Sequence, residues 1–115
     1  IIRNFILKIF KDDFEVIVAN DGKEALDIIN DPEKNTKIKA MLLDLNMPNV
    51  NGFEVLDYFK NNDLFTKYPT SIITGVDDKE SIEKAYKYPI VDILLKPFNE
   101  RDVKKILEKT LNNIM

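Results

Sequence analysis

The sequence predicts an α/β fold, a doubly wound parallel sheet with helices on both faces. Strand-like and helix-like segments alternate along the chain, an order that favours parallel strands joined by crossover helices. The apolar run at residues 40–43 is typical of a strand that is buried on both faces. Since the chain has 115 residues, we expect one domain, spanning residues 1–115.

The first third of the chain predicts a helix, a strand and a second helix. Apolar residues recur at helical spacing in residues 1–10. Residues 14–19 are apolar and β-branched enough for a strand. Asp21, with Glu24 three residues later, is an N-cap pair typical of a helix start. That helix should end before a polar loop at residues 31–37.

The middle of the chain predicts two further strand–helix units. A strand at residues 40–43 leads through a Pro- and Gly-containing loop to a helix at residues 53–61. A strand at residues 70–74 precedes a charged helix at residues 78–88, which has only a thin apolar face and should stop before Pro89.

The last quarter predicts a strand at residues 91–95 and a final amphipathic helix capped by Asn99. The total is four strands and five helices. An α/β unit of this kind normally opens with a strand, so one strand is missing from the expected set.

Composition excludes several kinds of chemistry. The sequence contains neither cysteine nor histidine, so disulfides, thiolate nucleophiles, Cys/His zinc sites and imidazole bases are absent. A net charge of −3 argues against broad nucleic-acid binding through phosphate contacts. No apolar run approaches the ~20 residues of a membrane helix. We therefore expect a cytoplasmic protein without direct contact to nucleic acid or membrane.

Three polar residues follow three successive predicted strands. Asp44, Thr74 and Lys96 stand where those strands end, and the ends of parallel strands meet at one edge of a sheet. An acid, a hydroxyl and an ammonium group together suit the capture of a phosphoryl group, with the carboxylate as nucleophile. Each residue also has a plainer interpretation, as a turn acceptor, a strand former or a solvated strand end.

The residues around these positions resemble the receiver domain of the bacterial two-component response-regulator family. The similarity covers the full chain and is most specific in MLLDLNMPNVNGFEVL around Asp44, SIITG ending at Thr74 and LLKPF around Lys96. The resemblance implies a CheY-like, flavodoxin-type (βα)5 fold in which Asp44 is the phosphoacceptor. It further implies that Thr74 is a switch hydroxyl, that Lys96 contacts the phosphoryl group, and that Asp44 and the backbone carbonyl of Asn46 help to bind Mg²⁺.

The resemblance also implies partners. A sensor histidine kinase or a phosphotransfer protein would supply the phosphoryl group, and a downstream effector domain or protein would read the switched surface. That surface would lie around residues 78–88, 91–95 and 99–114, and a dimer is one of the states that the resemblance allows. The chain would be no enzyme beyond catalysing its own phosphorylation and dephosphorylation.

Departures from the family limit this transfer, among them Gly75 after Thr74, where the family commonly has another small residue. The family's first strand and the acidic pair that holds Mg²⁺ would lie upstream of Ile1, so we expect an N-terminally truncated receiver that binds Mg²⁺ weakly and phosphorylates poorly. The aromatic residue that the family commonly carries three positions before Lys96 is Ile93 here, which we interpret as a core strand residue.

Two alternatives remain from the sequence. A receiver-like interaction module that is not phosphorylated would keep the fold without the Mg²⁺ site. A phosphatase of the haloacid-dehalogenase type would also place an aspartate nucleophile at a strand end, but it carries a second acid two residues later, where this chain has Asn46.

Overall fold

The fold is described from a computed structural model of the chain. The structure describes Lys8, Phe10, Ile17, Ala19 and residues 21–45, 52–75, 79–95 and 98–112. Most of the first predicted helix and of the predicted strand at residues 14–19 lies outside these ranges. Lys8 and Phe10 have helical backbone, as the prediction for residues 1–10 requires.

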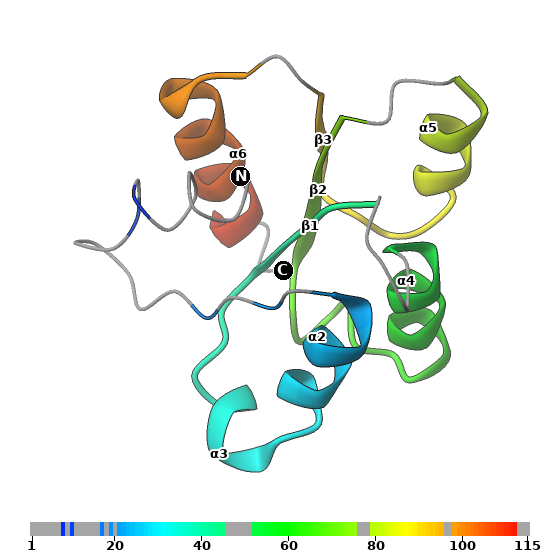
Figure 1. The fold of residues 1–115 in the computed structure, drawn as a ribbon, viewed down its shortest axis with the longest axis vertical. Coiled ribbons are helices and arrows are strands. Elements are labelled where there is room, and N and C mark those ends of the chain that lie inside the picture. The colour runs from blue at the N-terminus through cyan, green and yellow to red at the C-terminus, as the bar shows by residue number, and fades with distance from the viewer. Residues whose placement is uncertain are drawn as a thin grey trace.

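Three parallel strands form the described part of the sheet, in the order β1-β2-β3 (Figure 1). Strand β1 is Met41–Leu43, β2 is Thr70–Thr74 and β3 is Ile93–Leu95. The parallel sheet predicted from the sequence is therefore confirmed, and the bounds of β2 are those predicted. Strand β1 begins one residue later than expected and β3 two residues later.

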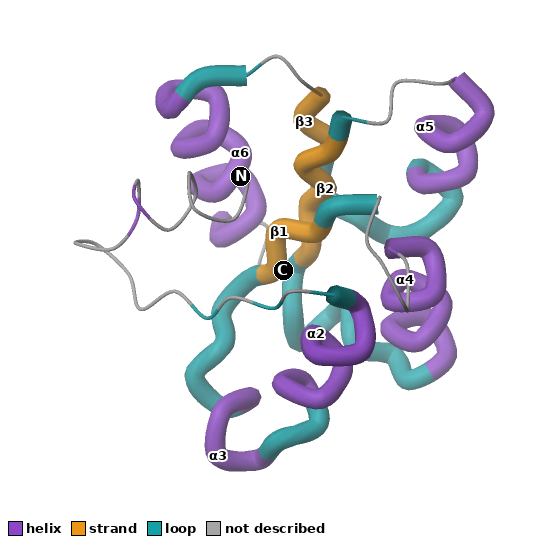
Figure 2. Tube along the Cα trace, viewed as in Figure 1, coloured by secondary structure: helices purple, strands orange, loops and turns teal. Residues whose placement is uncertain are grey.

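Five helices accompany the strands in the described part of the chain, and they cover both faces of the sheet (Figure 2). Helix α6 lies on one face, and α2, α4 and α5 lie on the other. Their bounds are Gly22–Ile29 for α2, Pro32–Asn35 for α3, Gly52–Asn61 for α4, Lys79–Ala85 for α5 and Glu100–Asn112 for α6.

The strand residues alternate between two apolar cores, as the period of two in a strand requires. Leu43, Ile72 and Ile93 pack into the core shared with α2, α4 and α5. Ile73 packs on the opposite face with Phe10 and with residues of α6. Ile93 thus contributes to the core, in agreement with its interpretation as a core strand residue.

Helix ends follow local capping chemistry. The Asp21 carboxylate accepts a hydrogen bond of 2.8 Å from the backbone N–H of Glu24, which confirms the predicted start of α2. At α6 the caps are reciprocal: Asp102 N–H donates to the Asn99 side chain at 2.9 Å, and Asn99 N–H donates to the Asp102 carboxylate at 3.2 Å.

Two helix predictions were wrong in detail. The loop predicted at residues 31–37 contains the short helix α3, because Asp31 accepts a hydrogen bond from Glu33 N–H and Pro32 suits a first helical position. Helix α5 ends at Ala85, three residues before the end predicted at residue 88. Its last turn tightens there, since Lys87 and Tyr88 N–H groups donate three residues back instead of four.

A search of the helices in the described ranges found none with the length and apolar character that crossing a bilayer would require.

Candidate functional site

The candidate site lies where β1 and β2 end. Leu43, the last residue of β1, pairs with Ile72 of β2, so Asp44 follows β1 beside the last residues of β2, which ends at Thr74. The Thr74 hydroxyl donates a hydrogen bond of 3.0 Å to Oδ1 of the Asp44 carboxylate. The structure therefore brings together two of the three strand-end residues singled out in the sequence.

Burial differs between the two partners. Thr74 is fully buried, whereas Asp44 is half-buried between Leu43 and Leu45, which are 3% and 4% exposed. Buried leucines on both sides hold the backbone of Asp44 in place, and the carboxylate keeps part of its surface open to solvent. A fixed and partly accessible carboxylate is what a nucleophile or a ligand to a small anion or cation needs.

Gly52 fixes helix α4 against the backbone of Asp44. Its N–H donates to the carbonyl oxygen of Leu45 at 3.2 Å. A Cβ atom at position 52 would lie 2.5 Å from Leu45 Cα and 2.8 Å from the Asp44 carbonyl oxygen, so a larger residue would displace the backbone. The sequence placed Gly52 in the loop after the strand, but the structure makes it the first residue of α4, where it is needed for this close approach.

The other predicted site residues are not described by the structure. Lys96 follows Leu95 in the sequence, and Leu95 is paired with Thr74 across β2 and β3. Asn46 follows Leu45. Both Lys96 and Asn46 lie outside the described residues, so their roles stay predictions, as do those of Asp44 and Thr74.

The resemblance to receiver domains noted in the sequence implies a Mg²⁺ site that includes Asp44. Within the described residues, no group of three His, Cys, Asp or Glu side chains could hold a metal ion. Asp44 supplies one carboxylate at the strand ends, and a hard cation such as Mg²⁺ needs further oxygen ligands or water. The described residues alone do not make up a Mg²⁺ site.

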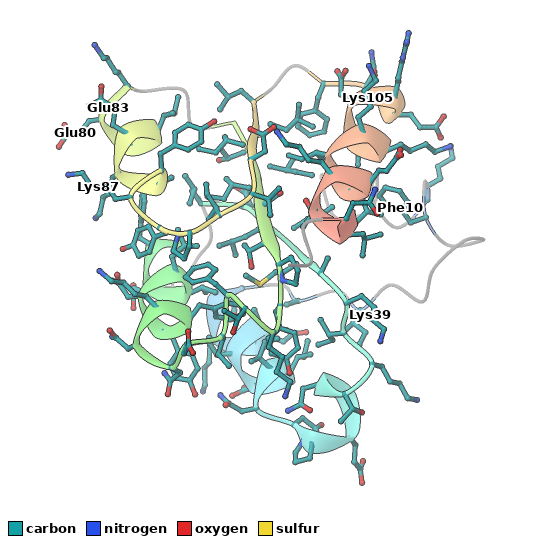
Figure 3. The ribbon with its side chains drawn as sticks, turned by 180° about the vertical axis from the view of Figure 1, so that it is seen from behind. Phe10, Lys39, Glu80, Glu83, Lys87 and Lys105 are labelled. Carbon is teal, nitrogen blue, oxygen red and sulfur yellow. The ribbon has the colours of Figure 1, made fainter. Side chains whose placement is uncertain are left out.

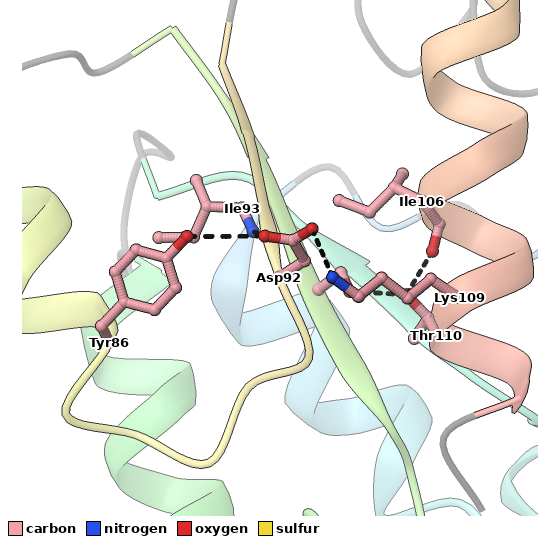
Figure 4. Close-up of polar contacts among 7 residues, drawn as sticks. Tyr86, Asp92, Ile93, Ile106, Lys109 and Thr110 are labelled. Carbon is pink, nitrogen blue, oxygen red and sulfur yellow. Dashed lines mark hydrogen bonds and ion pairs between the residues drawn. The ribbon is translucent and has the colours of Figure 1, made fainter.

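A second polar cluster, missed by the sequence analysis, lies at the start of β3 and joins the elements on either side (Figure 4). The Asp92 carboxylate accepts hydrogen bonds from Lys109 Nζ of α6 at 3.0 Å, from Ile93 N–H at 2.8 Å and from the Tyr86 hydroxyl at 3.4 Å. Burial alone would raise the pKa of Asp92, but the hydrogen bonds from Lys109 and Ile93 outweigh it and hold that pKa below its ordinary value.

The same cluster affects Tyr86. Burial and the neighbouring Asp92 charge raise the pKa of Tyr86, so its hydroxyl remains a donor at neutral pH. An acid directly before an apolar strand was visible in the sequence. Its partners 6 and 17 residues away were not, because they depend on how the elements pack.

The fold and the site define a class, the doubly wound α/β proteins that carry an acid at the end of a parallel strand. Comparison with known proteins then identifies the family. The family described as "response regulator receiver domain" matches residues 1–108 of the chain. The chain belongs to this family.

Individual relatives of the chain are chemotaxis proteins of the CheY type. A chemotaxis protein CheY homolog of Campylobacter jejuni is 30% identical over 111 residues, covering 96% of this chain and 82% of the relative. Chemotaxis protein CheY1 of Helicobacter pylori is 28% identical over 111 residues, covering 96% of this chain and 86% of the relative.

Solved structures agree as well. The receiver domain of the Francisella response regulator 1452 matches with a TM-score of 0.80 and 26% identity, covering 96% of this chain and 87% of that one. The Vibrio cholerae chemotaxis protein CheY4 also matches with a TM-score of 0.80 and 26% identity, covering 96% of this chain and 89% of that one. The CheY-like fold predicted from the sequence is confirmed.

Proposed function

We propose that this receiver domain accepts a phosphoryl group on Asp44 from a sensor histidine kinase or a phosphotransfer protein. The hydrogen bond of 3.0 Å from Thr74 to the Asp44 carboxylate carries the proposal, because it places a hydroxyl donor beside an acid at the end of a buried strand. Family membership supports the same role. Such a donor would be ready to bond an oxygen of the incoming phosphoryl group.

The chemical step is a phosphoryl transfer from nitrogen to oxygen. An oxygen of the Asp44 carboxylate attacks phosphorus, the phosphorus–nitrogen bond of the donor phosphohistidine breaks, and its electron pair returns to the imidazole nitrogen, which is then protonated. The product is an acyl phosphate, which water can hydrolyse to restore the carboxylate. In this proposal the chain is no enzyme beyond these two reactions on its own side chain.

Phosphorylation would then change the surface. It adds a charge of about −1.5 to −2 and three acceptor oxygens beside Thr74. The Thr74 hydroxyl would turn to a phosphoryl oxygen, and the chain that follows it leads directly into α5. We propose that α5 moves while α6 stays in place, and that the surface formed by α5, β3 and α6 thereby reports this change to a downstream effector domain or protein in the cytoplasm.

Intact mass spectrometry tests the proposal. The chain is incubated with acetyl phosphate and millimolar Mg²⁺, as it stands and extended upstream of Ile1. We expect a gain of one phosphoryl group that is lost in Asp44→Asn and retained in Asp27→Asn, a control on the exposed side of α2. No gain in either form of the chain would contradict the proposal and favour the unphosphorylated interaction module.

A further inference from the structure

Helix α5, the element that follows Thr74, has little apolar packing of its own. It is seven residues long, and Ala85 is its one buried residue. A helix this short gains little stability from its own hydrogen bonds, so contacts with its neighbours must position it. Two polar contacts with α4 add to the packing of Ala85 in the apolar core.

The two contacts have matching spacing. The Tyr88 hydroxyl, just beyond α5, donates a hydrogen bond to Oδ1 of Asp57 on α4. Lys84 Nζ lies 4.4 Å from the centre of the Phe53 ring, also on α4, which is a cation–π distance. Phe53 and Asp57 are four residues apart on α4, and Lys84 and Tyr88 are four residues apart in the sequence. Both contacts therefore join the same side of α4 to the same side of α5. We call these four residues the α4–α5 tether.

Apolar side chains do not fill the space beside the tether. A pocket of about 400 Å³ lies there, lined by Lys60 of α4, by Tyr88 and by charged residues of α5 and its last turn. Glu80, Glu83 and Lys87 lie on the side of α5 that is turned away from the sheet (Figure 3). Ala85, Phe53 and Tyr88 also pack against the apolar core, so the tether adds polar contacts to the apolar packing that joins the two helices.

The tether connects the two partners of the candidate site through their helices. Helix α4 begins at Gly52, which is packed on the backbone of Asp44 and Leu45. Helix α5 follows Thr74 after a short connection. A bond between α4 and α5 thus resists movement of the Thr74 side of the site relative to the Asp44 side.

We propose that Tyr88 and Asp57 are positioning residues that hold α5 in the arrangement in which Thr74 bonds the Asp44 carboxylate, and that they thereby limit the rate of Asp44 phosphorylation. The inference rests on the proposed function. Phosphorylation draws Thr74 toward a phosphoryl oxygen, so a contact that favours the present position of α5 opposes it by the free energy of that contact. Burial, the hydrogen bond to Asp57 and the Asp57 charge raise the pKa of Tyr88 to about 12, so the hydroxyl is a donor throughout the neutral range.

Removing one tyrosine hydroxyl at a time provides matched variants. Tyr88→Phe breaks the bond to Asp57. Tyr86→Phe, two residues earlier, removes a bond to Asp92, and Tyr58→Phe removes a bond of 2.9 Å from α4 to Asn30, the residue that follows α2. The phosphorylation rate with acetyl phosphate is measured by intact mass, in the form of the chain that takes up the group, together with the free energy of unfolding of each variant.

We expect Tyr88→Phe to phosphorylate about threefold faster than the unaltered chain, a size set by one solvent-accessible hydrogen bond to a charged group. Tyr86→Phe and Tyr58→Phe should leave the rate unchanged, although each loses a hydroxyl. Asp57→Ala should accelerate the reaction to the same extent, and the double variant Asp57→Ala/Tyr88→Phe should be no faster than either single one.

An unchanged or lower rate in Tyr88→Phe, with normal uptake by the unaltered chain, would overturn the inference and leave the proposed function intact. Equal acceleration in all three tyrosine variants would overturn it too, since a general loss of stability would then explain the effect. No uptake by the unaltered chain would instead contradict the proposed function, and the inference would fail with it.

Discussion

Helices α5 and α6 lie on opposite faces of the sheet beside β3, and they are held there in different ways (Figure 1). Helix α6 has 13 residues, a reciprocal N-terminal cap and three buried side chains. Helix α5 has seven residues and one buried side chain, and polar contacts fix its position. The element that follows Thr74 is thus the one with fewer buried contacts, and local stability is lowest where such contacts are few.

A buried polar pair adds to the attachment of α6. The hydroxyls of Ser71 on β2 and Thr110 on α6 lie 2.5 Å apart, and both residues are fully buried. Thr110 gives its one proton to the Ile106 carbonyl oxygen at 2.6 Å, so Ser71 must donate to Thr110. All hydrogen-bonding groups of this pair are satisfied, so α6 has a buried polar attachment to the sheet in addition to its apolar packing.

Matched isoleucine substitutions should give the largest contrast. Ile106→Ala on α6 removes a side chain that is 5% exposed and should lower the free energy of unfolding by about 2–5 kcal/mol. Ile82→Ala on α5 removes a half-buried side chain and should cost less than about 1 kcal/mol. Urea unfolding measures both, and equal losses would abolish the distinction between the helices.

The buried hydroxyl pair should give an intermediate effect. Thr110→Val leaves the Ser71 hydroxyl buried without its acceptor, which costs about 1–3 kcal/mol of unfolding free energy. Ser71→Ala/Thr110→Val removes both hydroxyls and should cost less than Thr110→Val alone, because no polar group is then left unpaired. Chemical denaturation of the three chains tests this, and a double variant that is the least stable would show that the pair does not act as a unit.

The Asp92 cluster should give the smallest effect, and one that depends on pH. The pKa of Asp92 is lower in the folded chain than in the unfolded one. Its charge therefore contributes stability above the ordinary aspartate pKa, and this contribution is lost as the pH falls through the folded value. Asp92→Asn should lower the unfolding free energy by about 0.2–1 kcal/mol at pH 7, since the pair with Lys109 is largely exposed.

The pH series supplies the check on this prediction. The difference between Asp92→Asn and the unaltered chain should shrink as the pH is lowered toward 3, and Lys109→Met should show the same trend. A difference that stays constant with pH would show that the Asp92 charge does not stabilise the contact between β3 and α6.

Local features of the sequence predicted much of the fold. The run TSIIT gave the bounds of β2, and the caps at Asp21 and Asn99 gave the starts of α2 and α6, because these depend on neighbours in the chain. Convergence of Asp44 and Thr74 followed from the parallel order of the strands. The short helix α3 was missed because its four residues carry no apolar periodicity.

Contacts between distant elements were not predictable in the same way. The bond from Tyr88 to Asp57 spans 31 residues and the pair Ser71–Thr110 spans 39. Which face of a helix meets which strand residue depends on the packing of whole elements. A polar residue such as Thr110 also interrupts the apolar pattern that predicts the buried face of α6. Features that hold one helix more firmly than another therefore emerge from the structure.

Hydrogen exchange with and without acetyl phosphate shows whether phosphorylation of Asp44 moves α5 while α6 stays in place, as we propose. Backbone amides of residues 79–85 should change their exchange rates when acetyl phosphate and Mg²⁺ are added, those of residues 100–112 should not, and Asp44→Asn should show neither change. An equal response of both helices, or a response of α5 that persists in Asp44→Asn, would contradict the account.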